Sequence, residues 1–175
     1  MHRNSRRRPY RPFGYYFITT NVCEGFAVLN RLDYGHLLEH VLYFSARIHS
    51  STIIAYKINP DHVHLIVQIG KKGTISDFMG SWKRQFSRQV NQLLFQEALS
   101  NTVYPGNDVP PGDDSNRRLV TTNNFRWQKS YHSHLITSHR DFENHINYIL
   151  KQQKHHGLED NKYCFVDHGH VFKFK

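Results

Sequence analysis

Pro60-Asp61-His62-Val63-His64-Leu65-Ile66-Val67 is the stretch from which the rest of the fold can be worked out. Its apolar and β-branched residues predict a strand, in which side chains alternate between two faces. His62 and His64 then project to one face, while Asp61 and Val63 project to the other. Two imidazoles held side by side on a rigid strand can bind one metal ion.

A His-x-His pair on a strand has a second interpretation, as two partly exposed polar residues without a ligand. The chain contains the same spacing again at His132 and His134, within a predicted strand over residues 131–137. The spacing alone therefore does not identify a metal site. A third partner and a defined chemistry are needed.

The composition predicts one basic domain. The chain has 175 residues, with 23 Lys and Arg against 14 Asp and Glu, and a formal net charge of +9. This surplus favours a polyanionic partner, first of all nucleic acid, although a basic protein without such a partner is the alternative. Cys23 and Cys164 are too few for a disulfide framework or a thiolate zinc site.

The N-terminal segment, residues 1–13, is expected to be a flexible arm. It contains five arginines together with Pro9 and Pro12, so it can contact phosphates or remain solvated. The sequence shows no apolar run of signal-peptide or membrane-spanning length. We therefore expect a cytoplasmic protein with no membrane partner.

The sequence pattern predicts both strands and helices along the chain. The expected order is strand 15–22, helix 33–50, strands 51–58 and 62–69, a helix from residue 74, strand 131–137 and helix 138–154. Only a short turn separates the two central strands, so they should form a hairpin. Asp33 is expected to cap the first helix, and Thr74 and Asp77 to form a capping box for the second.

Basic and aromatic side chains are candidates for contacting DNA. Lys83, Arg84 and Arg88 fall largely outside the apolar stripe of the second helix, and they form either a basic ridge for a phosphate backbone or a solvated face. Trp127 and Tyr131 are candidates for stacking on bases, with a core anchor as the preferred interpretation of Trp127. The stripe itself consists of Phe78, Met79, Trp82, Phe86, Val90 and Leu93.

Two segments have no periodic pattern. Residues 99–124 are rich in Pro, Gly, Asp and Asn, which predicts a long loop inserted into the domain. Residues 158–175 are expected to be a C-terminal tail, and residues 171–175 can pack back as an edge strand.

The last predicted helix has a tyrosine on its polar face. At 100° per residue, His145, Lys151 and Gln152 lie on the same side as Tyr148. The apolar side chains Phe142, Ile146, Ile149 and Leu150 lie on the far side. A core tyrosine usually belongs to the apolar stripe, so both a functional and a packing role stay open for Tyr148.

Three motifs in this order resemble those of the one-tyrosine HUH transposases. They are Pro60-Asp61-His62-Val63-His64-Leu65-Ile66, Trp127-Gln128-Lys129-Ser130-Tyr131 and Tyr148-Ile149. This family includes the transposases of single-strand insertion sequences and the REP-associated tyrosine transposases. The resemblance covers residues 14–157, which we therefore expect to form the catalytic domain.

The resemblance implies an α+β fold, a ferredoxin-like sandwich with a central antiparallel β-sheet and helices packed on it. It also implies a metal-dependent endonuclease and strand transferase that acts on single-stranded DNA with hairpin ends. By analogy, Tyr148 would be the nucleophile that forms a 5′-phosphotyrosine intermediate, and His62, His64 and Gln152 would bind Mg²⁺ or Mn²⁺.

The resemblance also implies a homodimer, although some members act as monomers. Two alternatives to an active transposase remain open at this stage. One is a domesticated relative that nicks repeat hairpins in the chromosome, and the other is a non-catalytic DNA-binding protein of the same fold.

Overall fold

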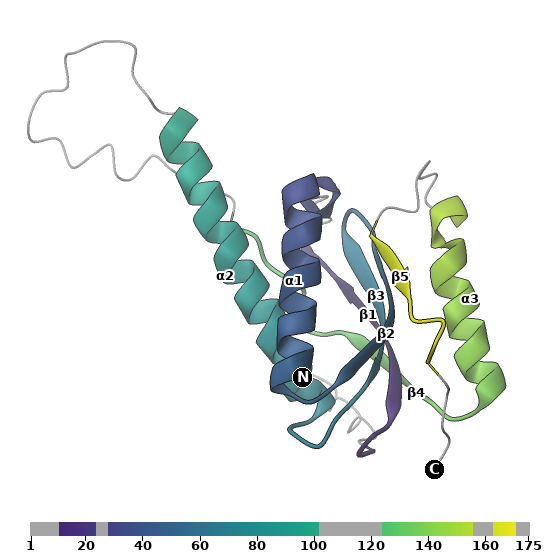
Figure 1. Cartoon of the computed structure of the whole chain (residues 1–175). Helices are drawn as coiled ribbons and strands as arrows, with labels where there is room; N and C mark the ends of the chain where they lie inside the picture. The colour runs from purple at the N-terminus through teal and green to yellow at the C-terminus, as the bar shows by residue number, and fades with distance from the viewer. Residues whose placement is uncertain (1–10, 24–27, 102–123, 156–162, 171–175) are drawn as a thin grey trace, which may run out of the picture.

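The computed structural model describes residues 11–23, 28–101, 124–155 and 163–170, which form a single sheet with three α-helices (Figure 1). The strands are β1 (Tyr15–Asn21), β2 (Thr52–Ile58), β3 (His62–Gln68), β4 (His132–Ile136) and β5 (Cys164–Val166). The helices are α1 (Leu32–Ile48), α2 (Ile75–Asn101) and α3 (His139–His155), and a short 3-10 turn, η2 (Val28–Asn30), precedes α1.

The sheet has the order β4-β1-β3-β2-β5, and its neighbouring strands are antiparallel. This arrangement confirms the predicted α+β fold with a central antiparallel sheet. The predicted hairpin is also confirmed, because β2 pairs with β3 across the turn at residues 59–61. β3 is the middle strand, and its side chains from Val63 to Val67 are buried on both faces.

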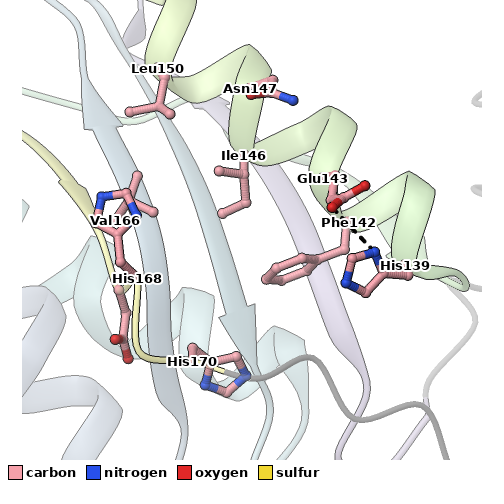
Figure 2. A pocket seen from close by; sticks show the side chains of 10 residues that line it. His139, Phe142, Glu143, Ile146, Asn147, Leu150, Val166, His168 and His170 are labelled. Atoms are coloured by element: carbon pink, nitrogen blue, oxygen red, sulfur yellow. Dashed lines mark ion pairs between the residues drawn. The ribbon is translucent and has the colours of Figure 1, made fainter.

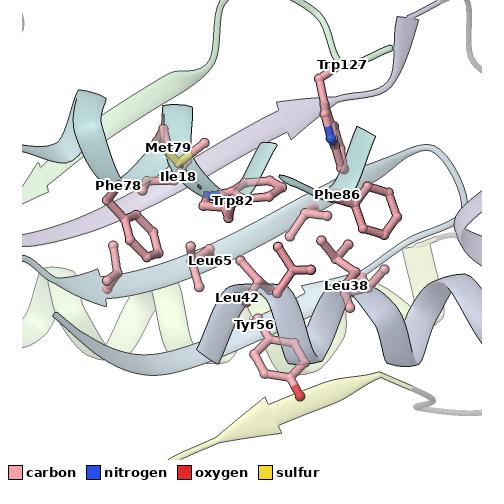
Figure 3. Packing of buried hydrophobic residues seen from close by; sticks show 14 of the residues in the cluster. Ile18, Leu38, Leu42, Tyr56, Leu65, Phe78, Met79, Trp82, Phe86 and Trp127 are labelled. Atoms are coloured by element: carbon pink, nitrogen blue, oxygen red, sulfur yellow. Dashed lines mark hydrogen bonds between the residues drawn. The ribbon is translucent and has the colours of Figure 1, made fainter. Parts of the chain in front are cut away.

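Helices cover both faces of the sheet (Figure 1). α1 and α2 pack side by side on one face, and α3 covers the other. The larger core lies beneath α1 and α2, where Trp82, Phe86 and Leu42 pack on Leu65 and its neighbours (Figure 3). The smaller core lies beneath α3 and includes Phe17, Ile66, Phe142 and Ile149.

The helix termini agree only partly with the sequence-based predictions. Thr74 and Asp77 do form a capping box, because Thr74 Oγ1 accepts the N–H of Asp77 at 3.2 Å and Asp77 accepts the N–H of Thr74 at 2.7 Å. Asp33 does not cap α1; it lies in the first turn, after Arg31, which makes no side-chain cap bond. A favourable charge near a helix N-terminus thus replaces the expected cap.

The far end of α2 also differs from the prediction. α2 continues to Asn101, so the first residues of the expected loop over 99–124 are helical, and residues 102–123 lie outside the described part of the chain. In Figure 1 this end of α2 extends beyond the sheet. Leu93 is therefore 37% exposed and not part of the core, although the other predicted stripe residues are buried.

A fifth strand was not predicted. β5 consists of only three residues and pairs with β2 at the edge of the sheet. It is too short for an alternating pattern to be recognised in the sequence. The edge strand expected from residues 171–175 and residues 1–10 of the arm expected over 1–13 lie outside the described residues. The last part of that arm is described, and the Arg11 N–H donates to the Tyr16 hydroxyl at 2.6 Å.

Among the residues that the structure describes, no helix combines the length and the hydropathy needed to cross a lipid bilayer.

Candidate active site

The two histidines of the central strand face α3 and lie against each other. The Nε2 atoms of His62 and His64 are 3.1 Å apart, and His64 is only 4% exposed. The intervening Val63 belongs to the core on the opposite face, as strand alternation requires. The prediction that both imidazoles share one face of the sheet is therefore confirmed.

Each imidazole is oriented through its other ring nitrogen. Nδ1 of His62 lies 2.7 Å from Asp61 Oδ1, and Nδ1 of His64 lies 3.0 Å from Thr19 Oγ1. Thr19 is the direct cross-strand partner of His64 on β1. When each Nδ1 carries the proton and donates to its oxygen, each Nε2 presents a lone pair with which it can bind one shared ligand.

Asp61 corrects one expectation, because it was predicted to project away from the histidines. It lies in the turn before β3, where strand alternation does not apply, and its carboxylate instead contacts His62. Thr19 was not predicted either. Its role depends on the register of β1 against β3, which the sequence of β1 alone does not specify.

The donor set fits a divalent cation. Two nitrogens 3.1 Å apart can both reach one ion at the usual metal–imidazole distance of about 2.0–2.1 Å. The amide of Asn59 lies beside His62, with its Nδ2 2.9 Å from Nε2, and Asn59 Oδ1 is buried without a hydrogen-bond partner. The amide of Asn59 therefore adjoins His62 through its nitrogen and carries an oxygen without a hydrogen bond.

Tyr148 lies on α3 against one member of this pair, His64. Its ring meets the ring of His64 edge-on with 5.1 Å between centroids, and it meets Phe17 edge-on at 5.7 Å. The side chain is 42% exposed, unlike the neighbouring Ile149, which is fully buried. The structure thus brings the predicted nucleophile against His64, one of the predicted ligands, while keeping its side chain partly open to solvent.

Gln152 follows Tyr148 by one turn of α3 and is 2% exposed. This burial was not expected from a residue on the polar face of the helix. Lys57 is a further buried polar residue on this side, 1% exposed and paired in register with His64 on β2. No role for Lys57 was predicted from the sequence, because it is a single charged residue in an otherwise apolar strand.

The three predicted basic residues of α2 differ in their surroundings. Lys83 donates to the carbonyl oxygen of Gln128 at 2.7 Å and to Thr20 Oγ1 at 3.0 Å, so it links α2 to β1 and to the segment before β4. Arg84 and Arg88 are exposed. These two guanidinium groups are thus the members of the set that a phosphate backbone can reach directly.

The two aromatic candidates are both packed against the core. Trp127 is 7% exposed, and its ring meets Trp82 at 5.1 Å and Phe125 at 5.3 Å. This placement favours a core anchor over a base-stacking surface. Tyr131 is half-buried against the same core, and its hydroxyl lies 3.2 Å from that of Ser76.

A second group of ionisable side chains lies near the start of α3. His134 Nε2 is 2.9 Å and His145 Nδ1 is 3.2 Å from the carboxylate of Asp141. Burial by itself would raise the pKa of Asp141, but hydrogen bonds from His134 and from the Thr137 N–H outweigh it and lower that pKa. Asp141 is therefore an ionised carboxylate between two imidazoles.

A groove of about 540 Å³ runs along another side of α3 (Figure 2). It is lined by His139, Phe142, Glu143, Ile146, Asn147, Leu150, Val166, Asp167, His168 and His170. Its charged wall includes the Glu143 and Asp167 carboxylates, and Glu143 pairs with His139. Carboxylates repel phosphates, so this groove is poorly suited to a nucleic-acid backbone.

Part of the sequence matches a known protein family. Residues 18–104 match the family model described as "Transposase IS200 like", a range that contains both histidines of β3 and ends before α3. No curated protein sequence matches the chain.

The solved structures that share the fold include the following two. A REP-associated tyrosine transposase bound to a REP hairpin has a TM-score of 0.64 and 22% identity, over 89% of this chain and 76% of the other. A Deinococcus radiodurans R1 protein assigned as a transposase has a TM-score of 0.50 and 17% identity, over 87% and 98%.

Proposed function

This chain belongs to the family of IS200-like transposases, and from that premise we propose that it cleaves and rejoins single-stranded DNA through Tyr148. The observation that carries the proposal is the contact between Tyr148 and His64, whose ring centroids are 5.1 Å apart. A solvent-exposed phenol beside a pair of converging imidazoles is a suitable arrangement for attack on a cation-bound phosphodiester.

The proposed reaction needs no external energy source. The Tyr148 oxygen attacks phosphorus in line and loses its proton, and the bond from phosphorus to the 3′-oxygen breaks. The departing 3′-oxygen takes up a proton, which leaves a 5′-phosphotyrosine and a free 3′-hydroxyl. A different 3′-hydroxyl can then reverse the step, so strands are exchanged while the phosphodiester energy is kept.

His62 and His64 are proposed to hold the cation through Nε2, with Gln152 as a further ligand. A bound Mg²⁺ or Mn²⁺ neutralises the anionic phosphate and leaves positions open for it. Asp61 and Thr19 keep the two rings in the required tautomer through their contacts with Nδ1. Phe17 stacks on His64 and limits the movement of its ring.

Hairpin DNA is the proposed substrate. The basic composition of the chain and the exposed Arg84 and Arg88 support contact with a nucleic-acid backbone. The structural neighbour bound to a REP hairpin supports the hairpin form of the substrate. We also propose a homodimer, and a mass equal to one chain in light scattering would contradict it.

The test is to incubate the full chain with Mn²⁺ and a pool of labelled single-stranded hairpin DNAs, and to search for a covalent adduct by denaturing gel and mass analysis. We expect an adduct that maps to Tyr148 and is absent from Tyr148→Phe. His64→Ala and a chelator should abolish it as well.

Tyr43→Phe is the matched control, because Tyr43 is also 42% exposed but lies on α1, across the sheet. It should form the adduct normally. An adduct that persists in Tyr148→Phe would overturn the nucleophile assignment. Hairpin binding with no adduct in the wild type would instead favour a non-catalytic DNA-binding protein.

A further inference from the structure

Three side chains from two elements meet beside the candidate active site. His134 comes from β4, while Asp141 and His145 come from the first turns of α3. Each offers one ligand atom, and the three atoms lie within 4.8 Å of one another. The rings of His134 and His145 stack with 5.0 Å between centroids, so the two imidazoles face each other beside one carboxylate.

The local fold holds this group in place. Asp141 and His145 are four residues apart and therefore lie on the same side of the helix. The carboxylate of Asp141 also accepts the Thr137 N–H at 3.1 Å, while its own N–H donates to Ser138 Oγ at 3.1 Å. These bonds fix Asp141 at the start of α3 without using all of its oxygen lone pairs.

The chemistry of the group is that of a metal site. Two imidazoles and one carboxylate are ligands that zinc and neighbouring transition metals accept, and three protein ligands leave room for water or substrate. The carboxylate of Asp141 supplies a negative charge that compensates a cation. All three side chains are partly exposed, so an ion can reach them from solvent.

We propose that His134, Asp141 and His145 bind a second divalent cation, of the zinc class, distinct from the one proposed at His62 and His64. This site does not depend on the proposed DNA chemistry, since its ligands are separate from those of the first site. His132 and His134 share the His-x-His spacing, but only His134 belongs to this group.

The second site lies next to the first across one aromatic ring. Phe17 contacts His145, with 4.3 Å between ring centroids, and it also contacts His64 and Tyr148. A cation there adds positive charge on the same face of the sheet as Tyr148.

The test measures metal binding in the absence of DNA. Zn²⁺ is titrated by calorimetry into the full chain and into His64→Ala, which removes a ligand of the first site. We expect His64→Ala to keep one Zn²⁺, and the further change Asp141→Asn or His134→Ala to weaken it more than about tenfold, since even second-shell partners contribute 10–100-fold. Asp141→Asn keeps an oxygen acceptor for the Thr137 N–H.

His132→Ala is the matched control, because it removes a histidine from the same strand and the same face. It should leave the retained Zn²⁺ affinity unchanged. Equal affinities in His132→Ala and Asp141→Asn would overturn the proposal. If circular dichroism shows that His64→Ala is unfolded, the same variants are compared in the wild-type background with Co²⁺. Asp141→Asn is then expected to lose one of two bound ions, together with the visible absorption of that ion. An unchanged number of bound ions would overturn the proposal.

Discussion

Oγ1 of Thr19 lies 3.0 Å from Nδ1 of His64, directly across the β1–β3 pair. Because this contact holds Nδ1 of His64, the opposite ring nitrogen, Nε2, faces His62. Thr19 therefore influences binding of the proposed cation indirectly, by orienting the imidazole of His64. Thr19→Val keeps the size of the side chain and removes the acceptor. We expect it to lower Mn²⁺ affinity about 10–100-fold, measured by calorimetry, with little loss of thermal stability.

Thr52→Val is the control for this change, since Thr52 is an exposed strand threonine on β2. Its Mn²⁺ affinity should equal that of the wild type. If Thr19→Val binds Mn²⁺ as well as Thr52→Val, the orienting role assigned to Thr19 is wrong.

Lys83 is expected to contribute to stability more than to DNA binding. Its ammonium group donates to Gln128 O and Thr20 Oγ1, which ties α2 to two other segments. Hydrogen bonds to charged groups contribute about 1.5–3 kcal/mol. Lys83→Met should therefore lower the free energy of unfolding by about that amount in urea titrations.

Arg84→Met provides the comparison, because Arg84 is exposed on the same helix. It should change the free energy of unfolding by less than about 0.5 kcal/mol while reducing hairpin affinity and its dependence on salt. The opposite pattern, a stable Lys83→Met and a destabilised Arg84→Met, would contradict this division of roles.

Trp127 is expected to be a structural residue. Its ring contacts Trp82, Phe86 and Phe125 within the larger core (Figure 3). Trp127→Ala should cost about 3–5 kcal/mol of unfolding free energy, as for other buried aromatic truncations. Trp127→Phe should lower Tm but leave hairpin affinity per folded molecule unchanged. A loss of affinity at unchanged Tm would show that the ring contacts DNA.

The sequence predicted the elements that alternate or repeat clearly. The strands β1 to β4 and all three α-helices lie within a few residues of their predicted ranges, because each is long enough for its pattern to be recognised. β5 has three residues and carries no such period. Its pairing with β2 depends on a tertiary contact that only the folded chain shows.

The residues of the candidate site could likewise be predicted only where sequence periodicity determines their position. Strand alternation was enough to place His62 and His64 on one face, and helical spacing was enough to separate Tyr148 from the apolar stripe. Thr19 and Asn59 could not be found this way, because their contacts depend on strand register and on the geometry of a turn. The burial of Gln152 depends on how α3 lies on the sheet.

Acid should weaken the start of α2 through Asp77. The backbone N–H and the hydroxyl of Thr74 both donate to this carboxylate, which lowers the pKa of Asp77. A carboxyl with a lowered folded-state pKa stabilises the fold above its unfolded pKa of about 3.9, and that stability is lost as the pH falls through the folded-state value. The Tm difference between wild type and Asp77→Ala should therefore be largest near neutral pH and shrink below about pH 4. Asp77→Asn keeps an oxygen acceptor but does not titrate, so its Tm difference from Asp77→Ala should stay nearly constant over the same range. An equal wild-type advantage over Asp77→Ala at pH 7 and at pH 3 would show that the charge of Asp77 does not stabilise the helix start.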